Sequence, residues 1–182
     1  LSDIQGYAYR EDVGARNLER ALKLYRPLRP DVILNDGDIN DHGRDLDFVR
    51  WYRRRCVETL GPVPHVACVG NHELGFVPNE LRSTRSYESI RREFNSIFGY
   101  EAEAKVIHLE IRGFDFFAIH LDNEKEYGTD AVEELERGLV AASRRDPSKS
   151  IFVVSHYHPY DTVFCSTYDD RDRRLRNLLN RF

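Results

Sequence analysis

Hydrophobic positions recur at helical spacing in several stretches of the chain. Leu18, Leu22 and Tyr25 mark one helical face, and Pro27 and Pro30 follow them, which predicts a first helix ending there. The same criterion, together with Gly and Pro breaks, predicts further helices over Val49 to Leu60, Arg85 to Phe98, Ala131 to Ser143 and, as a basic amphipathic tail, Asp170 to Phe182.

Short continuous apolar runs lie between these helices. The runs Val32 to Leu34, His65 to Val69 and Ile151 to Val154 predict buried strands. Ala104 to Ile111 and Phe114 to Leu121 flank Arg112-Gly113 and predict an antiparallel hairpin. Helices and strands that alternate in this way indicate an α/β fold with some antiparallel pairing. No repeat or linker divides the chain, so we expect a single domain over residues 1–182.

Composition narrows the function classes. Among 182 residues, 27 Lys+Arg and 31 Asp+Glu give a net charge of −4, which does not favour nucleic acid as a partner. No apolar run approaches the roughly 18 residues of a membrane span. Three cysteines without paired spacing indicate neither a disulfide framework nor a thiolate zinc site. We expect a soluble protein and favour the cytoplasm, although the sequence assigns no compartment and no oligomeric state.

Polar side chains follow three of the predicted strands. Asp38 comes soon after the first, Asn71 and His72 after the second, and His156 after the last. Ligands of open α/β sheets gather at the carboxyl ends of strands. Carboxylate, amide and imidazole donors suit Mn²⁺, Fe²⁺ or Zn²⁺, so we expect a centre of two divalent ions with the Asp38 carboxylate as the bridge.

The motifs resemble the calcineurin-like metallophosphoesterase superfamily. The resemblance is carried, in this order, by G-D-x-x-D at Gly37 to Asp41, G-N-H-E at Gly70 to Glu73, and strand-His-x-x-Pro at His156 to Pro159. It implies a four-layer αββα sandwich that hydrolyses phosphomonoesters or phosphodiesters with two metal ions and a bridging hydroxide.

The resemblance also implies roles for particular residues. Asp3 resembles a ligand of the first metal, Asp38 the bridge, and Asn71 and His156 ligands of the second metal. His72 resembles the residue that stabilises charge or protonates the leaving oxygen. On this basis Asp38 and His72 are the candidate catalytic residues.

Two departures from the family pattern leave alternatives open. Gln5 stands where the first motif usually has a histidine, and its amide oxygen would be a weaker ligand for Zn²⁺. The closing Gly-His-x-His motif is absent, so we expect a family member truncated at its carboxyl end. His158 is the alternative to His156 as a ligand. The second functional hypothesis is therefore a catalytically weak or inactive binding module with the same fold.

Overall fold

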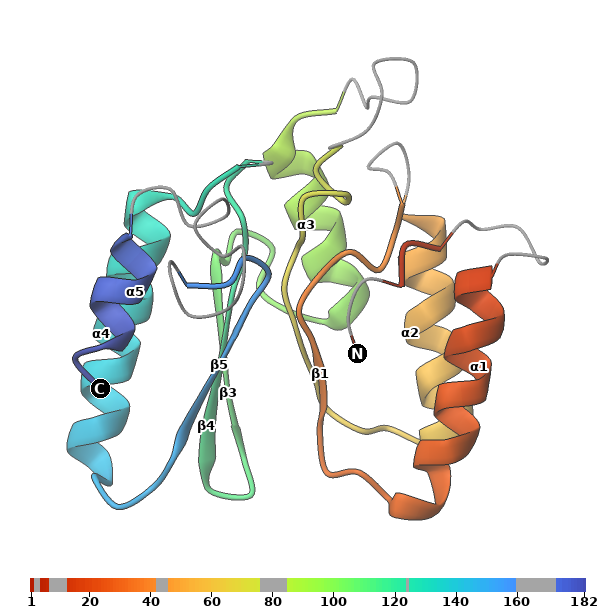
Figure 1. Cartoon of the computed structure of the whole chain (residues 1–182), viewed down its shortest axis with the longest axis horizontal. Coiled ribbons are helices and arrows are strands. Elements are labelled where there is room, and N and C mark those ends of the chain that lie inside the picture. Colours follow the sequence, from red (N-terminus) through yellow and green to blue (C-terminus); the bar gives the residue numbers. More distant parts are fainter. Residues whose placement is uncertain (2–3, 7–12, 42–45, 76–84, 124, 160–172) are drawn as a thin grey trace.

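The computed structural model describes residues 1, 4–6, 13–41, 46–75, 85–123, 125–159 and 173–182. Helices and strands alternate through the first half of the chain and again near its end (Figure 1). In chain order the elements are α1 (Val13–Tyr25), a short 3-10 helix (Arg26–Leu28), β1 (Ile33–Asn35), α2 (Asp47–Leu60), β2 (His65–Ala67), α3 (Tyr87–Phe98), β3 (Val106–Ile111), β4 (Phe114–Ile119), α4 (Thr129–Arg145), β5 (Ile151–Ser155) and α5 (Arg174–Leu179).

The strands form two sheets. In the first, β1 and β2 are parallel, with Ile33 opposite His65. In the second, β4 lies at the centre, antiparallel to β3 and parallel to β5, with Ile119 opposite Ser155. A backbone hydrogen bond of 3.5 Å from Leu121 to Val69 connects the segments that follow β4 and β2. The carboxyl ends of β1, β2, β4 and β5 therefore lie at one end of the molecule.

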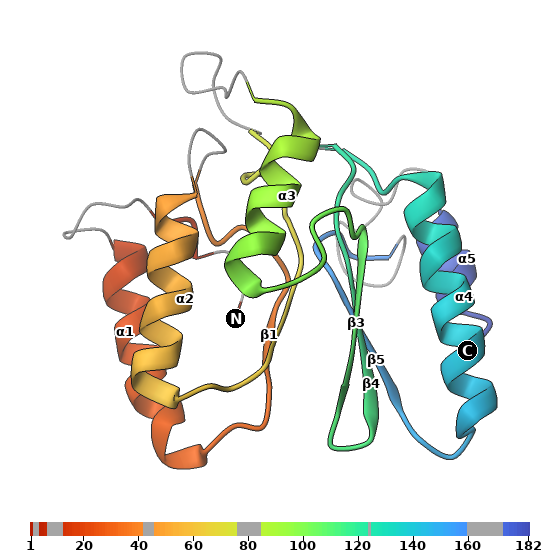
Figure 2. The same cartoon turned by 180° about the vertical axis from the view of Figure 1, so that it is seen from behind.

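Helices lie on the outer sides of both sheets (Figures 1 and 2). On one side α1 and α2 pack together and α3 lies beside α2, while α4 and α5 lie on the other side. Between the sheets, Val66 of β2 and the neighbouring Cys68 pack against Phe116, Ala118 and Val154. These five side chains form an apolar layer because every second residue of a strand faces the same side.

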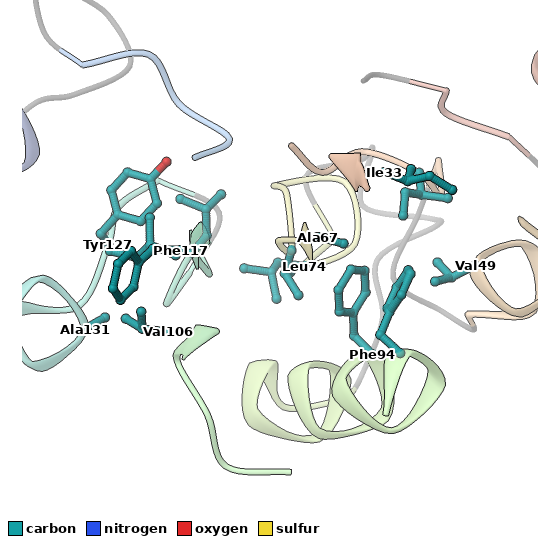
Figure 3. Packing of buried hydrophobic residues seen from close by; sticks show 14 of the residues in the cluster. Ile33, Val49, Ala67, Leu74, Phe94, Val106, Phe117, Tyr127 and Ala131 are labelled. Carbon is teal, nitrogen blue, oxygen red and sulfur yellow. The ribbon is translucent and has the colours of Figure 1, made fainter. Parts of the chain in front are cut away.

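The larger core joins the helices to the outer faces of the sheets. Phe94 of α3 lies near Ala67 and Leu74, and Phe117 of β4 lies near Val106 and Ala131 of α4 (Figure 3). The buried positions of α1 are Ala15, Leu18 and Leu22, so the predicted helical face is the one that packs inward.

The structure confirms the α/β class and the kind of every predicted element, with corrections. Local periodicity did not indicate how many sheets the strands form; the structure has two, and β2, which is buried on both faces, packs on the second sheet. The tail helix predicted over Asp170 to Phe182 is shorter, and its described part is α5. None of the helices described is both long enough and apolar enough to cross a membrane.

Candidate metal centre

The turn after β1 sets the position of Asp38. The side chain of Asn35 accepts a hydrogen bond of 2.9 Å from the Gly37 backbone N–H, an arrangement typical of Asn at turns. Gly37 has φ of 100° and Asp38 has φ of 51°. A left-handed conformation is costly for a residue other than glycine and often marks a functional site.

Two glycines let the segments after β1 and β2 approach each other. A Cβ atom at Gly37 would lie 2.7 Å from the Gly70 nitrogen and 2.9 Å from Nδ1 of His156. A Cβ atom at Gly70 would collide with Oδ1 of Asp38. Glycine at both positions is therefore needed for the approach of the Asp38 and His156 side chains to the β2 loop.

Three side chains from three strand ends converge in this space. Oδ1 of Asn71 lies 2.6 Å from Nε2 of His156, and Oδ1 of Asp38 lies 3.5 Å from the same nitrogen. Asp38 and Asn71 are buried, and the side chain of His156 is 8% exposed. An amide oxygen, a carboxylate oxygen and an imidazole nitrogen thus share one small, mostly enclosed volume.

The orientation of the His156 ring suits a metal ion. Its Nδ1 lies 2.7 Å from the backbone oxygen of Asp36, which can only accept, so Nδ1 carries the hydrogen. In the neutral ring Nε2 then presents a lone pair toward the amide oxygen of Asn71. Two acceptor atoms facing each other at close range favour a cation between them, and a backbone carbonyl on the other ring nitrogen is typical of metal-ligating histidines.

Gln5 lies at the edge of the cluster. Its backbone N–H donates to the Asp38 carbonyl at 2.9 Å, and its side-chain amide lies 3.5 Å from Oδ2 of Asp38. Its φ of 44° is again left-handed. Asp3, the other residue predicted from this segment, lies outside the described residues.

His72 lies next to the cluster and is held from one side. Its Nδ1 is 2.9 Å from the backbone oxygen of Asp41, while its Nε2 is 3.9 Å from Oδ2 of Asp38. The side chain is 21% exposed. Asp41 also places its carboxylate 3.7 Å from Nδ1.

Glu73 has a structural role that the sequence analysis missed. Its carboxylate accepts three backbone N–H bonds, from Asp38 at 2.9 Å, Asn40 at 2.7 Å and Gly70 at 2.8 Å. It thereby connects the loops that carry Asp38 and Asn71. Burial, and next the Asp38 carboxylate, raises the pKa of Glu73, whereas the N–H donors act in the opposite direction. The Gly-x-x-Glu spacing, in which a glutamate reaches back three residues to a backbone N–H, was the available signal.

The remaining predicted donors are placed differently. His158 is exposed, whereas His156 faces Asn71. Across the described part of the chain, no three His, Cys, Asp or Glu side chains come together as a metal-binding group. Here the donor cluster combines one carboxylate and one imidazole with the amide oxygen of Asn71, while Gln5 turns its amide nitrogen toward Asp38. His65 and His120 are buried, at 4% and 1% exposure.

Comparison with known proteins shows the family of this chain. The family model described as calcineurin-like phosphoesterase matches residues 1–181. The chain belongs to this family. Calcineurin-like phosphoesterases typically use a dimetal centre.

One similar solved structure is a dimetal phosphatase from Danio rerio. The two chains share 12% sequence identity with a TM-score of 0.66, and the match covers 100% of this phosphoesterase-family chain and 76% of that chain. At this identity the likeness shows the fold alone. A search of curated proteins gave no match.

Proposed function

We propose that this calcineurin-like phosphoesterase hydrolyses phosphomonoesters or phosphodiesters at a centre of two divalent ions, with Mn²⁺, Fe²⁺ and Zn²⁺ as candidates. The observation that carries the proposal is the convergence of Asp38, Asn71 and His156, with two acceptor atoms 2.6 Å apart. We further propose that residues 1–182 form a single domain with the four-layer αββα arrangement of this family. The order of helices, sheet, sheet and helices supports that assignment.

The residues divide into those that hold the ions and those that act on the substrate. Asp38 would bridge the ions, since its two oxygens face different neighbours, His156 on one side and Gln5 on the other. Asn71 and His156 would hold one ion, and Asp3 with Gln5 the other. Divalent ions at such a site lower the pKa of water and neutralise phosphoryl oxygens.

His72 would serve the leaving group. The Asp41 carbonyl lies 2.9 Å from Nδ1, which leaves Nε2, 3.9 Å from Oδ2 of Asp38, facing the cluster on a side chain that is 21% exposed. A proton held on Nε2 could then be donated to the departing oxygen as the ester bond breaks.

Hydrolysis of p-nitrophenyl phosphate and bis-p-nitrophenyl phosphate with added Mn²⁺ tests the proposal. We expect Mn²⁺-stimulated turnover that Asp38→Asn reduces by at least about 100-fold, because the bridging carboxylate loses its charge. The preferred ester would identify the substrate class.

Asp31→Asn is the matched control. Asp31 precedes β1, at the opposite end of the strand from Asp38, and pairs with Arg112 at 2.7 Å on the surface. This variant should retain turnover. Absence of Mn²⁺-stimulated turnover in the wild-type chain would overturn the proposal and favour the alternative of a binding module with this fold, which Gln5 in place of a histidine also supports.

A further inference from the structure

Tyr127 contacts the segment that carries His156. It lies between β4 and α4, and its side chain is buried with 5% exposure. Its hydroxyl accepts a hydrogen bond of 2.8 Å from the Tyr157 backbone N–H and donates one of 3.3 Å to the Tyr157 carbonyl. One buried side chain thus holds both backbone groups of the residue that follows His156.

These hydrogen bonds lie just beyond the end of the β4–β5 ladder, where the strand pairing no longer holds the backbone. The ladder between β4 and β5 ends at the pair Ile119 and Ser155, so His156 and Tyr157 lie just beyond it. The hydroxyl of Tyr127 bonds the backbone of Tyr157, two residues beyond Ser155. The Tyr127 ring also meets the Tyr157 ring edge to face at 6.5 Å, and the Tyr157 ring lies 5.1 Å from the His156 imidazole.

Tyr127 is itself held from the opposite side. The guanidinium of Arg174 in α5 donates a bond of 3.0 Å to the Tyr127 carbonyl and also contacts the hydroxyl of Thr129. Arg174 therefore binds the segment between β4 and α4 to α5, and Tyr127 binds the same segment to the loop after β5.

We propose that Tyr127 is a positioning residue for His156: it sets the backbone after β5 so that Nε2 of His156 points toward Asn71 and Asp38. This inference rests on the proposed function, because the site that it positions is the metal site. It goes beyond the family motifs, since Tyr127 belongs to none of them.

Tyr127→Phe tests the inference, with Tyr100→Phe as a matched control. Tyr100 makes the same pair of bonds elsewhere, accepting from the Ala67 N–H at 3.1 Å and donating to the His65 carbonyl at 2.9 Å. Each variant removes one hydroxyl that bridges a backbone N–H and a backbone carbonyl. Binding of Mn²⁺ is measured from the electron paramagnetic resonance signal of the free ion, and the melting temperature is measured in a chelator.

Both variants should lower the melting temperature in chelator by similar amounts. Only Tyr127→Phe should weaken Mn²⁺ binding, by about 3–10-fold, which is less than the loss of a group bonded directly to a ligand because Tyr127 acts through the backbone. Unchanged Mn²⁺ affinity in Tyr127→Phe would overturn the inference, as would equal weakening in both variants. Failure of the wild-type chain to bind Mn²⁺ would overturn the proposed function as well, so the two failures are distinguishable.

Discussion

Glu73 shows how much of the site depends on one buried carboxylate. It accepts backbone N–H bonds from Asp38, Asn40 and Gly70, which belong to two separate loops. The loss of a hydrogen-bond partner costs far more free energy for a buried polar group than for an exposed one. The positions of Asp38 and Asn71 relative to each other are therefore set mainly by Glu73.

We predict that Glu73→Gln lowers the free energy of unfolding by about 1–3 kcal/mol, because the glutamine amide would face the Asn40 N–H with a second donor. Urea unfolding measures the change. Glu58→Gln is the control, and its side chain, 48% exposed and paired with Arg55, should contribute less than about 1 kcal/mol. Equal midpoints for Glu73→Gln and the wild-type chain would contradict this role.

At the scale of residues, the sequence indicated which candidate donor side chains lie together better than it indicated the residues that support them. Asp38, Asn71 and His156 were singled out because each follows an apolar strand, and the structure brings these three together. The supports at Glu73 and Tyr127 depend on contacts across 30 or more residues. Such contacts leave no periodicity in the chain, so the sequence alone indicates their partners only weakly.

The close approach of α4 to β4 is the clearest packing constraint between elements. Gly138 lies in α4, and a Cβ atom there would lie 2.5 Å from Cε1 of Phe117. Phe117 is buried at 2% exposure and stacks on His108 with ring centroids 4.4 Å apart. The helix can therefore lie this close to the sheet only where it lacks a side chain.

Gly138→Ala should destabilise the fold by about 1–3 kcal/mol through overpacking. At a solvent-exposed position of a helix the same change would stabilise the fold by up to about 1 kcal/mol. The sign of the effect therefore shows whether Gly138 is in close contact with the sheet. In a double-mutant cycle measured by urea unfolding, Phe117→Leu should restore part of the free energy of unfolding that Gly138→Ala removes, because leucine leaves room for the methyl group. Stabilisation by Gly138→Ala alone would show that the helix lies farther from the sheet.

At the scale of elements, periodicity and turn residues predicted each α-helix and strand and the pairing within the hairpin, but not the pairing of the other strands. The strand predicted over Val32 to Leu34 is β1 shifted by one residue, and the hairpin is antiparallel as expected. The division into two sheets was not visible from local patterns, since runs buried on both faces, such as β2, look alike in one sheet or in two packed sheets.

At the scale of the whole molecule, two histidines outside the candidate site residues, His65 and His120, are buried. Burial, with a smaller effect of the nearby Arg53, lowers the pKa of His65 to about 4. Burial, with Arg91 nearby, lowers the pKa of His120 to about 3. Below pH 6.5 the unfolded chain takes up protons at these residues while the folded chain does not, so the free energy of unfolding falls as pH falls toward 4.

We expect each histidine to reduce the free energy of unfolding by roughly 2 kcal/mol at pH 5 relative to neutral pH. Urea unfolding in chelator at pH 7, 6 and 5 measures the total dependence. His65→Phe retains an aromatic ring beside Tyr52 and Phe98 and should remove the contribution of His65. The same pH dependence in this variant and in the wild-type chain would contradict the assignment.

At the scale of the whole molecule, we propose that the strand ends of both sheets jointly hold divalent ions. Anomalous diffraction from crystals grown with Mn²⁺ tests it most directly, because it locates the ions without reference to activity. We predict anomalous peaks in contact with the Asp38 carboxylate, one of them shared with the Asn71 amide oxygen and Nε2 of His156. Crystals of the folded chain with no peak at these three side chains, or with Mn²⁺ bound only elsewhere, would contradict the account.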